Sequence, residues 1–151
     1  MFDSLRQKIM GKRLLLMGIG NRLRGDDAIG PLLIDRLQGN VTADVLDAGD
    51  VPENYLGVIE SFRPEIILMV DAVDFGGKPG EVAWFSLDQL SNVTFGTHNA
   101  SLHLLFKALQ LDPPPEVFLL AIQPAHIIFQ ASLSAPVMET LDLLEKIILK
   151  I

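Results

Sequence analysis

Apolar runs and amphipathic segments alternate along this chain. Five predominantly apolar runs have the length of β-strands: residues 13–19, 43–48, 66–72, 81–86 and 117–122. Apolar side chains recur at helical spacing in five other segments: residues 2–11, 27–38, 52–62, 99–110 and 134–150. We predict a single α/β domain over residues 1–151. It has three layers, with helices on both faces of a mostly parallel, twisted sheet of about five strands.

A glycine turn connects the first strand to the next helix, in the stretch MGIGNRLRGDDAIG from Met17 to Gly30. Gly18 and Gly20 allow a sharp reversal at the end of a strand, as in loops that bind dinucleotide phosphates. However, Leu23 stands at the position of the third glycine of that fingerprint. Asp26 and Asp27 begin the helix, where they cap backbone N–H groups and disfavour a phosphate. A cation suits this turn better than a nucleotide.

Polar side chains follow each strand of the predicted parallel sheet. Because the carboxyl ends of parallel strands meet at one edge, where ligands bind, we expect these side chains to gather there. They are Asn21, Asp26, Asp27, Asp47, Asp50, Asp71 and Asp74, and Thr97-His98-Asn99 returns to the same edge at the start of a later helix. The run 81–86 is expected to form an antiparallel edge strand, and the glycine-rich loop 75–80 a mobile flap over the site.

Asp71 ends an apolar run that is typical of a fully buried strand. A carboxylate at that depth needs a metal ion, an arginine or backbone N–H groups as partners. With Asp27 and His98 it would form an oxygen and nitrogen ligand set suited to Ni²⁺, Zn²⁺, Mn²⁺ or Fe²⁺. His98 also fits a surface or helix-capping role, and we expect His103 and His126 to be structural, the latter without acidic neighbours.

Composition and charge argue against several classes of function and of site. The net charge of −7 and the lack of a basic stripe argue against nucleic-acid binding. The chain has no cysteine, so thiolate nucleophiles and thiolate metal sites are excluded. Apolar segments are too short for a membrane span, and the N-terminus lacks a secretion-type cleavage site. We therefore expect a cytoplasmic protein with no membrane partner.

The order of short motifs from Leu14 to Pro124 resembles that of the hydrogenase maturation endopeptidases, closest to the branch that processes formate-hydrogenlyase-type, membrane-bound hydrogenases. The motifs are Gly18-Ile19-Gly20-Asn21, Asp26-Asp27, Asp47-x-Gly49, Val70-Asp71-Ala72, Pro79-Gly80-Glu81, Thr97-His98-Asn99 and Ile122-Gln123-Pro124. Their combination is far more specific than a glycine motif alone.

The resemblance implies an endopeptidase that removes the C-terminal extension of a [NiFe]-hydrogenase large-subunit precursor after nickel insertion. The metal-contacting positions of the family correspond to Asp27, Asp71 and His98, which are the expected catalytic residues, and nickel is carried by the precursor. Asp27 replaces the glutamate of some members. Asp47 matches a position linked to substrate discrimination, and Asn21 and Thr97 are expected to contact the precursor.

Two other functions compete with this one. A nucleotide-binding domain would use Gly18 and Gly20 for phosphate and Asp47 for ribose. A non-enzymatic nickel-binding chaperone would share the acidic edge but leave its partner uncut. Neither explains the later motifs. We expect no bound nucleotide, a large-subunit precursor as the partner, and a monomer.

Overall fold

The computed structural model describes residues 2–90 and 99–151. Its centre is a five-stranded sheet in the order β2-β1-β3-β5-β4. The strands are β1 (Leu14–Gly18), β2 (Asp44–Asp47), β3 (Ile66–Ala72), β4 (Val82–Ser86) and β5 (Glu116–Ile122). Neighbours from β2 to β5 are parallel, and β4 runs antiparallel along the edge of β5. The predicted strands and the antiparallel edge are confirmed.

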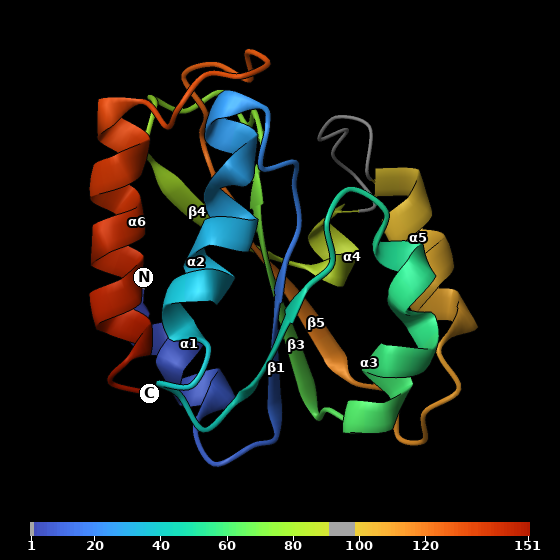
Figure 1. Ribbon diagram of the computed structural model, residues 1–151. Coiled ribbons are helices and arrows are strands. Elements are labelled where there is room, and N and C mark those ends of the chain that lie inside the picture. The colour runs from blue at the N-terminus through green and yellow to red at the C-terminus, as the bar shows by residue number, and fades with distance from the viewer. Residues whose placement is uncertain (1, 91–98) are drawn as a thin grey trace.

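Helices cover both faces of the sheet, as predicted (Figure 1). Those on one face are α1 (Phe2–Ile9), α2 (Ile29–Leu37) and α6 (Ala135–Ile148). Those on the other face are α3 (Leu56–Phe62), α4 (Leu87–Leu90) and α5 (Asn99–Ala108). Alternate side chains of each central strand enter the two cores, since Leu16 and Leu68 face the first group while Met17 and Met69 face the second. In the described part of the chain, no helix combines the length and apolarity that a bilayer crossing requires.

Two predicted helices begin later than expected, each after a short 3₁₀ turn. The turn η1 (Gly25–Ala28) precedes α2, and η2 (Pro52–Tyr55) precedes α3. The four-residue helix α4 was not predicted, because so short a segment shows no helical period.

Backbone lies directly on backbone where α2 meets the sheet. A Cβ atom on Gly30 would lie 2.5 Å from the carbonyl oxygens of both Ile19 and Val70, and one on Gly18 would lie 2.6 Å from the carbonyl oxygen of Gly30. Only glycine fits both positions, and the two residues bring the first turn of α2 down onto the ends of β1 and β3. Asp27, three positions before Gly30, is thereby carried to the carboxyl edge.

Asp26 fastens the loop 125–134 to this same turn. Its fully buried carboxylate accepts hydrogen bonds from the backbone N–H groups of Ala125 (2.8 Å), His126 (3.3 Å) and Ser134 (2.7 Å) and from the Ser134 hydroxyl (2.9 Å). Burial raises the pKa of the Asp26 carboxyl, but these hydrogen bonds outweigh burial and hold the pKa below its ordinary value.

Two expectations from the sequence are wrong here. Asp26 does not cap a helix: the cap residues of η1 and α2 are Arg24 and Ala28, and neither helix start has a side-chain cap bond. His126 does have an acidic neighbour, since its backbone N–H donates to the carboxylate of Asp26, which lies 100 residues earlier in the chain.

We predict that Gly30→Ala lowers the free energy of unfolding by about 2 kcal/mol or more, because the added methyl group overlaps two carbonyl oxygens. Urea denaturation monitored by circular dichroism measures this loss. Gly57→Ala is the matched control, because a Cβ atom there meets nothing within 4 Å; inside α3 it should stabilise by about 0.5–1 kcal/mol. Equal effects of the two substitutions would contradict the packing argument.

Asp26→Asn should lower the unfolding free energy at neutral pH by roughly 2 kcal/mol, because the amide cannot accept all four hydrogen bonds. A lowered native-state pKa stabilises the fold above the unfolded-state pKa, and this contribution is lost as the pH falls through the native-state pKa. The difference between wild type and variant should therefore shrink below about pH 4. Urea titrations at several pH values test this, with exposed Asp44→Asn as control; a difference that does not change with pH would refute it.

Candidate active site

The carboxyl ends of three parallel strands form the edge at which the predicted site residues lie. Gly18 of β1 pairs with Asp47 of β2 on one side and with Val70 of β3 on the other. Asp71 directly follows Val70, and the Ile19 N–H donates to the Val70 carbonyl at 2.9 Å. The structure thus brings the segments that follow β1, β2 and β3 to one edge, as predicted, but Asp26 points into the protein and not to that edge.

The glycine turn fixes Asp27 in place. The backbone N–H of Asn21 donates to Asp27 Oδ2 at 2.8 Å, which closes the loop between the end of β1 and the start of η1. Gly20 lies so close to the Asp27 backbone that a Cβ atom on Gly20 would be 1.9 Å from the Asp27 carbonyl oxygen. The Asp27 carboxylate is thus held by the backbone, and the residue as a whole is half-buried.

Asp71 is the charged residue at the end of the central strand β3. It is 3% exposed, pairs in register with Ala121 of β5 and follows five buried apolar residues. Since Gly30 of α2 packs on the Val70 carbonyl and η1 contacts β3, Asp27 and Asp71 both lie at the carboxyl ends of the paired strands β1 and β3. A carboxylate buried this deeply needs polar or charged partners that offset the loss of its hydration.

The third predicted metal-contacting residue, His98, lies outside the described residues, as does Thr97. Among the residues that are described, no three histidine, cysteine, aspartate or glutamate side chains are placed to hold a metal ion together. The described part of the predicted ligand set is therefore the pair Asp27 and Asp71. Two oxygen ligands of this kind suit a divalent ion that has other ligands elsewhere.

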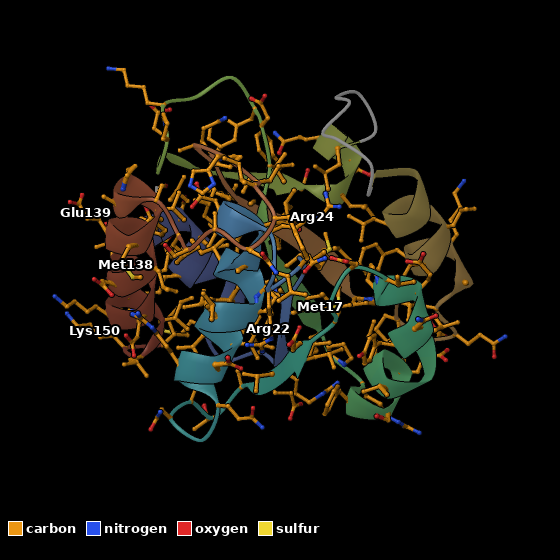
Figure 2. All side chains as sticks on the ribbon, turned by 45° about the horizontal axis from the view of Figure 1, so that its top comes forward. Met17, Arg22, Arg24, Met138, Glu139 and Lys150 are labelled. Carbon is orange, nitrogen blue, oxygen red and sulfur yellow. The ribbon has the colours of Figure 1, made fainter. Side chains whose placement is uncertain are left out.

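Asp47, the predicted substrate-contacting residue, is held by Arg22. The guanidinium donates to Asp47 Oδ2 at 2.7 Å and also binds both carboxylate oxygens of Asp35 on α2. Hydrogen bonds from Arg22 to Asp35 and Asp47 raise the pKa of the guanidinium, and the Arg22 bond lowers the pKa of Asp35. Figure 2 labels Arg22 and Arg24, which both lie in the turn between β1 and η1. Sequence analysis missed Arg22, because its partners are 13 and 25 residues away.

Asn21 contributes through its side chain as well as its backbone. Its amide nitrogen donates to Asp50 Oδ2 at 3.1 Å, and its amide oxygen accepts from the Leu23 N–H at 2.8 Å. The residue thus connects the Asp27 turn to the loop after β2, and these contacts give Asn21 a positioning role at the edge.

The loop 75–80 is tied down at several points, which argues against the mobile flap expected from the sequence. Buried Gln123 accepts from the N–H groups of Phe75 (2.9 Å) and Gly77 (3.0 Å), and its own amide donates to Asp74 at 3.1 Å. The Gly80 N–H donates to the Gln123 carbonyl, and Thr140 of α6 donates to the Gly80 carbonyl. Gln123 also lowers the pKa of Asp74. Gln123 belongs to the motif Ile122-Gln123-Pro124, but the sequence did not predict its role in holding this loop.

Comparisons with known proteins agree with this architecture. The model of the HycI family, hydrogenase maturation protease, matches residues 31–151. The chain is 35% identical over 133 residues to the Hydrogenase 3 maturation protease of Escherichia coli, covering 85% of this chain and 83% of that protein.

Solved structures show the same fold. The crystal structure of a [NiFe] hydrogenase maturation protease, HycI from Thermococcus kodakarensis, matches with a TM-score of 0.78 and 31% identity over 97% of both chains. The solution structure of the endopeptidase HycI from Escherichia coli matches with a TM-score of 0.77 and 28% identity, over 91% of this chain and 89% of that one. The fold, the order of motifs along its carboxyl edge and these similarities agree, and the chain belongs to the hydrogenase maturation protease family.

Proposed function

We propose that this protein removes the C-terminal extension of a [NiFe]-hydrogenase large-subunit precursor, and that Asp27, Asp71 and His98 contact the nickel which the precursor carries. The observation that supports this most is that a carboxylate held by the backbone, Asp27, and a buried one, Asp71, lie at the same edge of the sheet. Such a pair supplies part of a coordination shell and leaves the remainder to the substrate.

In this proposal the metal is both a recognition element and an orienting group. Binding the precursor through its nickel fixes the position of the scissile peptide bond relative to the protein. The nickel ion would polarise the peptide carbonyl or activate a water molecule, and a neighbouring carboxylate would accept the proton of that water. The chain has no cysteine, so the cleavage uses no thiol nucleophile.

Asn21, Asp47 and Thr97 are proposed to contact the precursor around the metal. Arg22 and Gly49 together determine where the Asp47 carboxylate points, because the guanidinium links one oxygen to Asp35 of α2 and the Gly49 N–H donates to the other oxygen. We further propose that the protein acts as a monomer in the cytoplasm, with no nucleotide, nucleic-acid or membrane partner.

The nucleotide-binding alternative fits the turn poorly. In that class of fold, free backbone N–H groups at the glycine turn receive phosphate. Here the Asn21 N–H already donates to the Asp27 carboxylate, and the Asp26 carboxylate is buried one residue earlier. An internal anion thus occupies the place and the hydrogen bond that a phosphate would need.

Precursor loaded with nickel should be cleaved at least about 100-fold faster than nickel-free precursor, if the metal supplies recognition energy of the size expected for one or two charge-assisted contacts. The release of the extension is followed by mass spectrometry at matched precursor concentrations. Equal cleavage of the two forms would defeat the role proposed for nickel, and an uncut partner would favour the chaperone alternative.

Asp27→Asn and Asp71→Asn should each reduce processing by about 100-fold or more, because each removes a charged contact to the metal. Circular dichroism and thermal melting establish that the variants are folded. Asp44→Asn serves as the matched control, because Asp44 is exposed and begins β2 at the opposite edge of the sheet. Folded variants with wild-type activity at both Asp27 and Asp71 would show that these residues are wrongly assigned.

A further inference from the structure

An apolar surface borders the candidate site and has no role in the mechanism proposed above. Ile127, Ile128 and Phe129 are 53%, 62% and 59% exposed, and Leu23 beside them is 58% exposed. Within the described residues, this is the one run in which consecutive large apolar side chains are exposed. We call Leu23 and residues 127–129 the apolar rim. Runs of this kind on soluble proteins are typical of binding surfaces.

The fold holds the apolar rim in an exposed position. Both ends of its loop are bonded to the buried Asp26 carboxylate, through Ala125 and His126 on one side and Ser134 on the other. The Gln130 N–H donates to the Leu23 carbonyl at 2.6 Å, and Arg24 forms an isolated antiparallel bridge with Phe129. These bonds prevent the loop from turning its apolar side chains inward, although burial would be favourable for them.

The apolar rim is continuous with the site. Asp26, which fastens the loop, directly precedes Asp27, and Leu23 and Arg24 lie between Asn21 and Asp26 in the same turn. In Figure 1 the loop passes above the N-terminal end of α2, at the carboxyl edge of the sheet. A precursor whose metal lies against Asp27 must therefore cover the apolar rim with the polypeptide that surrounds that metal.

Charge distinguishes the rim from the other side of the site. Toward β2, the edge carries Asp47 and Asp50, of which Asp47 is paired with Arg22, whereas Arg24, labelled in Figure 2, is exposed beside the rim. The side of the precursor that faces the rim should accordingly be apolar and carry an acidic group close to its border.

We propose that the apolar rim docks an apolar surface of the hydrogenase large-subunit precursor next to its metal centre. This inference rests on the proposed function for the identity of the partner. The rim would be a recognition element that does not depend on the metal. It supplies affinity for the precursor, while Asp27 and Asp71 contact the nickel.

The test measures binding and cleavage with Ile128→Ser and Phe129→Ser. With nickel-loaded precursor, each variant should raise KM roughly tenfold and leave kcat within about twofold, because the rim contributes binding and not chemistry. Met10→Ser is the matched control: Met10 is 60% exposed, like Ile128, but lies after α1 near the amino ends of the strands. An unchanged KM in both rim variants would overturn the proposal.

Nickel-free precursor separates this inference from the proposed function. Wild-type protein should bind it by calorimetry, and the rim variants should bind it roughly tenfold more weakly than Met10→Ser does. Fast cleavage of nickel-free precursor would defeat the metal role and leave the rim intact, whereas equal binding by rim and control variants would defeat the rim alone. Two further outcomes would overturn the proposal if KM stays unchanged. A wild-type dimer that Phe129→Ser dissociates would assign the surface to a second copy of the chain. Flotation of the wild type with phosphatidylcholine vesicles that Phe129→Ser abolishes would assign it to lipid.

Discussion

The contact between Gly18, Gly30 and the Val70 carbonyl is the constraint on which the rest of this structure depends. Backbone packs on backbone there, with no side chain between the first turn of α2 and the ends of β1 and β3. That close packing places the turn from Gly20 to Ala28 over the carboxyl edge. Its two adjacent aspartates, Asp26 and Asp27, have different roles. Asp26 points into the protein and holds a loop, while Asp27 is bonded to the Asn21 N–H at the edge.

This division explains how one short stretch serves both stability and function. The Asp26 carboxylate is desolvated, yet it stays charged because backbone and hydroxyl donors surround it. Rigidity of the loop 125–134 follows, and with it the fixed exposure of the apolar rim. On the other side of the turn, Arg22 clamps Asp47 to α2. The edge is thus a preformed surface, acidic toward β2 and apolar toward the loop 125–134.

The sequence predicted the strands and the layered fold well, because the strands other than β2 are predominantly apolar runs of strand length. The glycine turn was correctly predicted to lie at the carboxyl edge of the sheet, but the role of Asp26 in it was predicted wrongly. Asp26 was expected to cap a helix, but its partners are 99 to 108 residues away, and no local pattern reveals a bond of that span. The same applies to Gln123, whose bonds to Asp74 and to the loop 75–80 span 46 to 49 residues of the chain. Thr97 and His98 lie outside the described residues, so the complete ligand set stays a prediction.

The central claim is that this protein engages the nickel of its substrate through Asp27 and Asp71 together with His98. X-ray absorption at the nickel edge tests it most directly, on nickel-loaded precursor frozen alone and in complex with the protein. The account predicts that complex formation adds oxygen and nitrogen ligands to the nickel shell, and that Asp27→Asn reduces the change. An identical nickel shell in the free and the bound precursor would contradict it.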